Sequence, residues 1–325
     1  MRDALKYSMV VPIFQDADLL DDFCLEFETV FSKFLGKQDI SEEVELIVVC
    51  DGGGRADEST ARAICNKFAF MRAILLSRNF GQHIALTAGY NSSRGEAVGM
   101  LNVDQQDPIS ELPKFLMHLA AENLDVVYGI RKKRQGSLME RLTSRYFHLI
   151  LDKLTDNKTP ANISTMRVMS RRFINAYNEF TESQRYLPGL ESWLGFDVGY
   201  VATLHRNRKK GTSSYTFMRR CKMAVNSILS FSDYPLRLIS LVGFLAALTG
   251  LASVATIIVM KLCLIDFQAG YPSLISVIVF FSGLVLSSLG FSSLYIGRIL
   301  REVQRRPTYI VKATINLSRT SLTTK

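Results

Sequence analysis

The sequence predicts an α/β domain built on a mostly parallel sheet, followed by two transmembrane helices. In the first 130 residues, short apolar runs rich in Val, Ile and Leu alternate with stretches of helical periodicity. This alternation is typical of a parallel sheet covered by helices on both faces. Further along, Leu238–Met260 and Pro272–Ile296 run for 23 and 25 residues without a charged side chain. About 20 apolar residues are enough to cross a membrane; the alternative is two buried helices of a soluble domain.

Seven elements can be placed in order along the first part of the chain. The apolar runs predict strands at Tyr7–Phe14, Glu45–Cys50, Met71–Ser77 and Ala97–Val103, and the periodic stretches predict helices at Asp18–Leu35, Glu58–Phe68 and Gln82–Ser92. Ligands of parallel sheets bind at the carboxyl ends of the strands. Polar residues that directly follow the strands are therefore the first candidates for a binding site: Gln15, Asp16, Asp51 and Asp104.

The glycine-rich segment "CDGGGRADEST" follows the second predicted strand. Its glycines do not have the G-x-G-x-x-G spacing and do not follow the first strand, so a dinucleotide-binding turn is not predicted. A flexible turn is the alternative reading of the glycines. Asp51 is the better candidate for ligand binding, because it closes a buried strand.

The segment "VGMLNVDQQDP" brings two acids, Asp104 and Asp107, to the end of the fourth predicted strand. Carboxylates at such a position often hold a metal ion on a diphosphate. A magnesium ion commonly takes only one or two protein carboxylates, together with phosphate and water oxygens. Asp104, with the amide oxygen of Asn102, is therefore a candidate ligand pair for Mg²⁺ or Mn²⁺. The alternative is that Asn102 and Asp104 only cap a turn.

The charge distribution predicts an anionic partner. The net charge is +9, and the segment Arg206–Arg237 holds eight Lys or Arg residues and one acid. A second basic run, Arg131–Arg134, follows a predicted strand and could hold a phosphate group, since arginine forks suit phosphate oxygens; a solvated charge run is the alternative. The five cysteines have no metal or disulfide spacing, which indicates reduced thiols in the cytoplasm.

The two apolar runs predict a membrane topology. Basic residues flank their outer ends, whereas the loop between them holds only Lys261 and Asp266. Because positive flanks stay in the cytoplasm, both ends are expected to face inward, at the inner membrane of a multi-pass protein. Residues 216–231 have helical apolar spacing with basic residues beside it, which predicts an interfacial helix or an ordinary surface helix. The predicted organisation is a cytoplasmic domain at 1–215, an interfacial helix at 216–235, two transmembrane helices within 236–300 with an external loop at 261–271, and a cytoplasmic tail at 301–325.

Several motifs together resemble one family. These are "SRNFGQHIALTAGY", "NVDQQDP", "YGIRKKR", "MRVMSRR", "GLESWLGF" and "SFSDYPLRL", in this order along nearly the whole chain. The chain resembles the membrane-bound polyprenyl-phosphate glycosyltransferases of glycosyltransferase family 2, a group that includes dolichol-phosphate mannose synthase and bacterial undecaprenyl-phosphate sugar transferases. The resemblance implies a GT-A, Rossmann-like catalytic domain, a nucleotide-sugar donor, a divalent metal ion and a lipid-phosphate acceptor.

The resemblance also implies residue roles. Donor-binding positions of the family match Pro12, Asp16, Asp51, Asn102, Gln106 and Asp107, and the metal-binding acid pair matches Asn102 and Asp104. The catalytic positions are Asp104, Arg131, Arg134 and Arg167. Arg131 and Arg134 match the family's basic loop that meets phosphate. Beside the resemblance, Arg167 or Arg208 is expected to assist them in binding the acceptor phosphate. The sequence departs from the family pattern where acids are usual: Cys50, Asn102 and Thr165 stand there instead.

The departure at Thr165 has a chemical interpretation. A phosphate monoester loses its second proton at about pH 6, so a lipid phosphate needs no base to attack a sugar donor. The sequence therefore predicts an inverting glycosyltransferase that moves a sugar from a nucleotide donor, UDP-linked in preference to GDP-linked, to undecaprenyl phosphate for cell-envelope glycans. The alternative is a non-catalytic relative that binds lipid or a partner subunit.

Three further expectations concern partners. A processive polysaccharide synthase is disfavoured, because "SQRYLPG" lacks the Q-x-x-R-W spacing and two spans make no channel. Nucleic acid is not an expected partner, since the basic residues flank the apolar runs. Small residues could pack spans together within one chain or in a homo-oligomer: Gly283, Ser287, Ser288 and Gly290.

Overall fold

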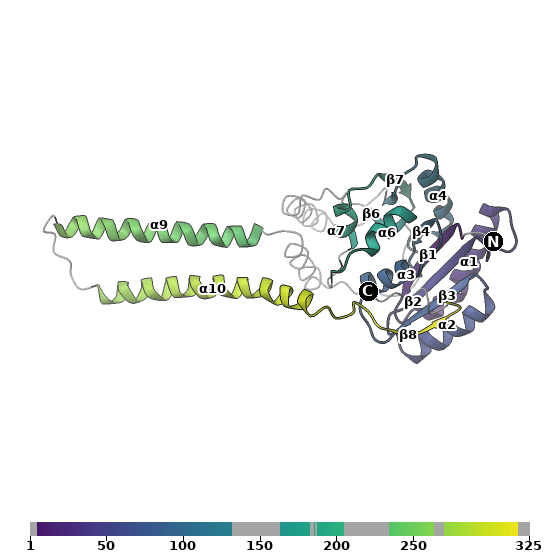
Figure 1. Cartoon of the computed structure of the whole chain (residues 1–325), viewed down its shortest axis with the longest axis horizontal. Helices are drawn as coiled ribbons and strands as arrows, with labels where there is room; N and C mark the ends of the chain where they lie inside the picture. Colours follow the sequence, from purple (N-terminus) through teal and green to yellow (C-terminus); the bar gives the residue numbers. More distant parts are fainter. Residues whose placement is uncertain are drawn as a thin grey trace. The chain divides into compact units, whose positions relative to one another are not determined.

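The structure is a computed structural model of the 325-residue chain and describes residues 5–131, 163–182, 185, 187–204, 234–262 and 270–317. The chain divides into two compact units. The first comprises Met1–Thr216 with Pro307–Lys325, and the second comprises Phe217–Arg306. Figure 1 shows the strands of the first unit and the two long helices of the second.

The first unit is built on an eight-stranded sheet with the order β7-β5-β6-β4-β1-β2-β3-β8. The pairs β1–β2, β1–β4, β2–β3 and β5–β7 are parallel, and β4–β6, β5–β6 and β3–β8 are antiparallel. The strands are β1 Tyr7–Ile13, β2 Val44–Cys50, β3 Met71–Leu76, β4 Ala97–Met100, β5 Val126–Arg131, β6 Ile163–Ser170, β7 Val198–Thr203 and β8 Val311–Ile315. The predicted mostly parallel sheet is confirmed.

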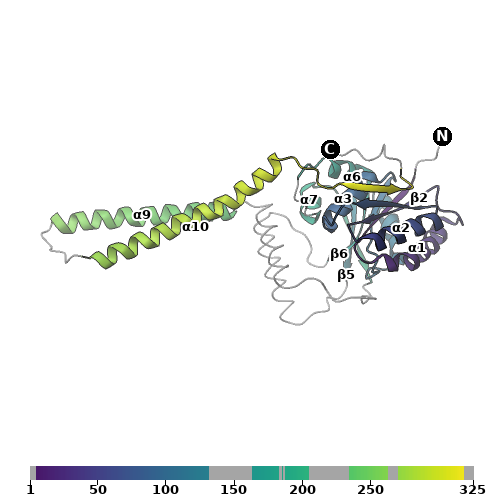
Figure 2. The same ribbon diagram turned by 90° about the horizontal axis from the view of Figure 1, so that it is seen from below.

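Helices cover both faces of this sheet (Figure 2). The helices α1, α2 and α4 pack with one set of alternating strand residues in the main apolar core, and α3 lies against the other set. At Gly89 of α3, a Cβ atom would lie 2.2 Å from Val10 of β1, so only glycine allows this close approach. The bounds are α1 Leu20–Leu35, α2 Arg55–Lys67, α3 Gln82–Ser92, α4 Leu112–Ala121, α6 Arg171–Asn178 and α7 Leu187–Trp193, with short 3-10 turns at Ala17–Leu19 and Ile109–Glu111.

Two of the seven predicted strands and helices differ from the structure by three residues at one end, and the other boundaries of these seven differ by no more than two. The strand expected at Ala97–Val103 ends at Met100, and the residues that follow form turns, with Gln105 at φ 52°. The helix expected from Glu58 begins at Arg55, after Gly54 with its φ of 92°. Gly54 takes a positive φ directly before α2, a conformation that glycine adopts without strain. The helix predicted at Gln82–Ser92 has the bounds of α3.

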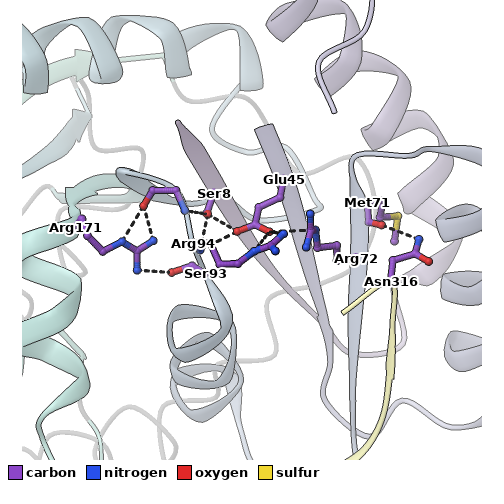
Figure 3. Close-up of polar contacts among 9 residues, drawn as sticks. Ser8, Glu45, Met71, Arg72, Ser93, Arg94, Arg171 and Asn316 are labelled. Atoms are coloured by element: carbon purple, nitrogen blue, oxygen red, sulfur yellow. Dashed lines mark hydrogen bonds and ion pairs between the residues drawn. The ribbon is translucent and has the colours of Figure 1, made fainter. Parts of the chain in front are cut away.

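A polar network ties the amino ends of the strands together (Figure 3). Its centre is Glu45 of β2, whose carboxylate is fully buried and accepts hydrogen bonds from the Ser8 hydroxyl at 2.6 Å and the Arg94 backbone N–H at 2.8 Å. The guanidinium groups of Arg72 and Arg94 each lie 3.1 Å from the same carboxylate. This end of the sheet is therefore closed by internal partners, and ligands are expected at the opposite edge.

The strand β8 comes from the far end of the chain. It pairs antiparallel with β3, with Ile315 opposite Ala73, and so forms one edge of the sheet. Just beyond it, the Asn316 side chain donates to the backbone carbonyls of Cys65 at 3.0 Å and Met71 at 3.2 Å; the second of these contacts is drawn in Figure 3. Residues 301–325 are predicted to form a cytoplasmic tail, and part of that segment, Val311–Ile315, is a strand of the sheet.

The second unit holds two long helices, α9 Tyr234–Leu262 and α10 Tyr271–Val303. Within α10, Phe280–Val303 is long and apolar enough to cross a membrane, and none of that stretch is buried. It is the only such helix in the described part of the chain; α9 contains a shorter apolar stretch, Leu238–Gly250. The two predicted spans are thus helical over their described residues. Membrane crossing by both is not confirmed.

Candidate active site

The carboxyl ends of the parallel strands bring distant polar residues to one edge. The loops after β1, β2 and β4 carry Asp16, Asp51 and Asp104, respectively. Because β6 runs antiparallel to β4, with Arg167 opposite Met100, the first residues of β6 reach the same edge. The sheet therefore gathers most of the residues that the sequence analysis selected. Arg134 and Arg208 lie outside the described residues, as does the side chain of Arg131, whose backbone ends β5.

Asp51 is buried and holds a neighbouring loop. Its two carboxylate oxygens accept hydrogen bonds from the backbone N–H groups of Phe80 at 2.7 Å and Gly81 at 2.8 Å, at the start of α3. Next to it, a Cβ on Gly52 would lie 2.3 Å from the Arg78–Asn79 backbone. The loops after β2 and β3 are thus fastened directly to one another. Binding of the nucleotide base or ribose by Asp51 stays a prediction.

Asp57 also fastens a neighbouring loop, a role that the sequence does not predict. This buried acid, in the first turn of α2, accepts a hydrogen bond from the Gln15 backbone N–H at 2.7 Å. Gln15 has a φ of 61°, a conformation that needs such support in a non-glycine residue. A Cβ on Gly53 would lie 1.6 Å from the Asp57 carboxylate, which explains the glycine there. An acid in the first turn of a helix is usually explained by the helix dipole, so sequence alone gave no signal for this contact.

The segment between β4 and α4 is linked to β6 by side chains. Asn102 donates through Nδ2 to the Thr165 hydroxyl at 3.0 Å, and that hydroxyl donates to Asp107 at 2.8 Å. Asp107 also accepts from the Ser164 hydroxyl at 2.5 Å. Two of the three positions where the sequence lacks expected acids, 102 and 165, are therefore in direct contact. Asp107, predicted to bind the donor, is buried and engaged with β6.

Asp104 is the acid at this edge best suited to a metal ion. It is half-buried and accepts a hydrogen bond at 3.3 Å from the Gln106 backbone N–H. Within the described ranges, no group of three or more His, Cys, Asp or Glu side chains could hold a metal ion. One carboxylate and a nearby amide oxygen still fit a cation that takes most of its ligands from a diphosphate and water. Pro12 and Gln106 are half-buried at the same edge, and Asp16 is exposed.

Arg167 is buried rather than open at the edge. Its guanidinium pairs with the carboxylate of Glu191 on α7, and that carboxylate also accepts a hydrogen bond from the Tyr128 hydroxyl at 2.9 Å. Burial is the largest single effect and lowers the pKa of Arg167, but the charge and hydrogen bond of Glu191, together with Tyr90 and Tyr128, raise it by more in sum, so the guanidinium stays charged. Arg167 thereby anchors α7 to the sheet. Its predicted catalytic role stays a prediction, with part of its charge neutralised by Glu191.

The cysteines of this unit are unsuited to catalysis. Cys24, Cys50 and Cys65 are buried and unpaired. Burial raises the pKa of each thiol to about 12. A thiol is nucleophilic only as the thiolate, so these side chains serve as small apolar groups. Cys50, which stands where the family usually has an acid, points into the apolar core.

The fold and its acid-lined edge define an enzyme of the GT-A type. The profile of glycosyl transferase family 2 matches residues 9–177, slightly more than half of the chain. The chain therefore belongs to glycosyltransferase family 2, and it is a glycosyltransferase. The expected GT-A α/β fold is confirmed.

Several curated proteins resemble nearly the whole chain. A prophage-derived bactoprenol glucosyl transferase of Shigella flexneri is 31% identical over 310 residues, covering 95% of this chain and 98% of the relative. An undecaprenyl-phosphate 4-deoxy-4-formamido-L-arabinose transferase of Yersinia pestis is 30% identical over 318 residues, covering 97% and 95%. Among solved structures, a mannosyltransferase of Pyrobaculum calidifontis in complex with GDP-Man and Mn²⁺ has a TM-score of 0.48 at 15% identity, covering 69% of this chain and 63% of that one.

Proposed function

We propose that the protein transfers a sugar from a nucleotide sugar to a polyprenyl phosphate at the cytoplasmic face of the membrane. The observation that supports this most is the full-length similarity to two kinds of enzyme whose names specify bactoprenol or undecaprenyl phosphate. The edge of the sheet that carries Asp16, Asp51 and Asp104 would hold the donor. A UDP-linked donor is proposed in preference to a GDP-linked one.

The proposed reaction is a single displacement with inversion. An oxygen of the acceptor phosphate attacks the anomeric carbon, the bond from that carbon to the diphosphate breaks, and the nucleoside diphosphate leaves. The acceptor needs no base, because a phosphate monoester has lost most of its second proton at about pH 7. This agrees with the residue at position 165. The Thr165 hydroxyl donates a hydrogen bond to Asp107 and is not a basic group.

The site must above all stabilise the negative charge that develops on the leaving diphosphate. A bound Mg²⁺ or Mn²⁺ would stabilise that charge as a Lewis acid, and Asp104, with Asn102 two residues before it, would hold the ion. The loops fastened by Asp51 and Asp57 would fix the nucleotide end of the donor. Arg131, Arg134 and Arg208 are proposed to meet the acceptor phosphate, because arginine pairs well with phosphate oxygens.

The membrane association proposed here is supported by connectivity. The strands β7 and β8 belong to one sheet, and both long helices lie between them in the chain. The chain must therefore return to the side of the membrane that it left, which requires an even number of crossings. If Phe280–Val303 crosses, another segment must cross as well, and α9 is the segment proposed.

A donor panel with a lipid acceptor tests the proposal. Membranes that contain the protein are incubated with UDP-glucose, other UDP-sugars and GDP-mannose, together with undecaprenyl phosphate, and lipid-linked sugar is measured. Product is expected on the phosphate and not on undecaprenol, since the alcohol has no ionised oxygen and Thr165 supplies no base. Equal product on undecaprenol would contradict the proposed acceptor chemistry. Absence of product with every donor would favour a non-catalytic relative.

A further inference from the structure

A row of hydrogen bonds crosses the proposed donor edge from α3 to the start of β6. Gln82 Nε2 donates to Asn102 Oδ1 at 3.3 Å, and Asn102 Nδ2 donates to Thr165 Oγ1 at 3.0 Å. Thr165 Oγ1 then donates to Asp107 Oδ2 at 2.8 Å. The row therefore connects three separate segments of the chain: α3, the segment between β4 and α4, and the start of β6. Both the oxygen and the NH₂ group of the Asn102 amide take part in it.

The direction of every bond in this row follows from the charge at its end. An ionised Asp107 can only accept, so the Thr165 hydroxyl must donate its single proton to it. The hydroxyl oxygen can then only accept from its other neighbour, which requires the Nδ2 group of Asn102 at that contact. The Asn102 carbonyl oxygen is thereby turned toward Gln82. The orientation of the amide is thus determined by the network, without any cation.

Carboxylates at these two positions would behave differently. Two ionised acids with oxygens about 3 Å apart repel, and they coexist only when they share a proton or hold a cation between them. Asn102 and Thr165 make the same contact as neutral groups at 3.0 Å. The contact between the end of β4 and the start of β6 therefore needs no metal ion to be stable.

We propose that the row Gln82–Asn102–Thr165–Asp107 takes the place of a bound cation in holding this edge together, so that the resting protein binds no divalent ion on its own. The cation then enters together with the donor diphosphate, and Asp104 receives the complex. This rests on the proposed donor site, and it agrees with the lack of any three-ligand group among the described residues. Thr165 and Asp107 are positioning residues in this proposal, because they act through Asn102.

The first experiment compares metal binding in the absence of any nucleotide. Purified wild type, Asn102→Asp, Thr165→Asp and the double variant are heated with EDTA or with Mn²⁺, and Tm is recorded. Wild type is expected to have the same Tm in both. The double variant is expected to be less stable in EDTA, because of the repulsion, and to regain Tm with Mn²⁺. If Mn²⁺ raises the Tm of the wild type as much as that of the double variant, the proposal is overturned.

A second measurement uses the wild-type protein. It therefore remains informative if the acidic variants do not fold. Free Mn²⁺ is followed by electron paramagnetic resonance with protein alone, with UDP or GDP alone, and with both. Bound Mn²⁺ beyond that held by the nucleotide is expected only when protein and nucleotide are both present. Tight binding by the protein alone would refute the proposal.

Substitutions at 165 separate positioning from general stability. Thr165→Ser keeps the hydroxyl and is expected to bind the Mn²⁺–nucleotide complex like wild type. Thr165→Val keeps the shape and releases Asn102, and roughly a tenfold weaker complex is expected, as for the loss of one or two hydrogen bonds to a polar site. Equal binding by the Val and Ser variants would refute the positioning role. The metal-only comparison involves no sugar transfer, so it stands or falls independently of the proposed function.

Discussion

At the scale of single residues, the acids of the proposed donor edge fall into two groups according to their contacts. Asp51 and Asp57 accept hydrogen bonds from backbone N–H groups of other loops, and Asp107 accepts from β6. These three are buried, so they organise the edge. Asp16 and Asp104 are more accessible and remain the better candidates for direct contact with donor or metal.

The first prediction concerns Asp104. Asp104→Ala is expected to reduce turnover by roughly 100- to 1000-fold, the usual effect of removing one preorganised electrostatic contact. Its loss leaves a cation with donor and water oxygens only. The measurement is lipid-linked product as a function of Mn²⁺ concentration. Asp16→Ala is the comparison at the same edge, with a smaller effect expected because Asp16 is exposed. Near-normal, metal-dependent turnover in Asp104→Ala would show that another acid holds the metal.

The second prediction concerns Asp51. Asp51→Asn turns an amide NH₂ toward one of two backbone N–H donors, so at least one hydrogen bond to the Phe80–Gly81 backbone is lost. We expect a loss of about 1–3 kcal/mol of stability and a rise in the KM for the donor. The loss of stability and the rise in KM are both expected because the loop after β3 is released. Thermal unfolding and donor titration check this; a raised KM without any loss of Tm would indicate direct donor contact instead.

The third prediction concerns pH. Burial, and secondarily the charge of Arg167, lower the pKa of His83 to about 4 from an ordinary 6.5. The unfolded chain therefore binds a proton that the folded protein does not, and stability falls as pH decreases from 6.5 toward 4. Between pH 6.5 and pH 5 this amounts to about 2 kcal/mol at most.

His83→Gln provides the control for this pH effect. The variant cannot take up the proton, so its Tm should fall less than that of wild type between pH 6.5 and 5. The buried carboxylates contribute equally to both proteins, and the difference between the two profiles isolates His83. Parallel profiles for the two proteins would contradict the lowered pKa.

At the scale of elements, the sheet joins strands from both ends of the sequence. The amino ends of β1 to β3 are joined through Glu45, and β8 is attached to β3 by backbone pairing and by the side chain of Asn316. Tyr309, just before β8, is buried and its hydroxyl accepts a hydrogen bond at 3.0 Å from Asn91 of α3. The segment that follows α10 is thus an integral part of the catalytic unit.

The fourth prediction tests this attachment. Asn316 has a φ of 57°, a conformation that Ala adopts with strain and Gly adopts freely. Asn316→Gly is expected to lose about 1–2 kcal/mol through the two missing hydrogen bonds, and Asn316→Ala about 1 kcal/mol more through backbone strain. Thermal unfolding of the two variants separates these contributions. If both variants unfold like wild type, β8 contributes little to the stability of the sheet.

At the scale of the whole molecule, connectivity constrains the topology. One sheet contains strands from before and after the two long helices, so if these helices cross a membrane, both flanks of the pair lie on the same side of it. Large apolar side chains are exposed along α10, including Phe280, Leu286 and Val303. Contiguous apolar surface of this kind is rare on soluble monomers and marks contact with lipid or protein.

The fifth prediction is the resulting topology. Cys263 lies in the loop that the sequence places outside, and Ile310, 55% exposed, lies next to β8. In a Cys221→Ser background, an impermeant maleimide is expected to label Cys263 in right-side-out vesicles. A cysteine introduced by Ile310→Cys should react only after the vesicles are opened. Labelling of position 310 in sealed vesicles would contradict the cytoplasmic assignment of the sheet.

The sequence by itself determined the class of fold and the edge that carries the site. Apolar runs such as Glu45–Cys50 alternate with helical periodicity, and the period of the pattern reports local structure directly. The match of α3 to its predicted bounds shows how well this works where polar and glycine residues mark both ends. Acids that follow strands could likewise be assigned to one edge, because the parallel arrangement alone brings them there.

Only the tertiary structure decided which partner each polar side chain takes. Asp57 with Gln15, Arg167 with Glu191, and Asn102 with Thr165 are separated by 42, 24 and 63 residues, and no local pattern reports such pairs. The same is true of β8, whose five residues have no strong alternation and pair with β3 across most of the chain. Side-chain partners depend on which strands become neighbours, and that choice is made by burial of the whole sheet rather than by any one segment.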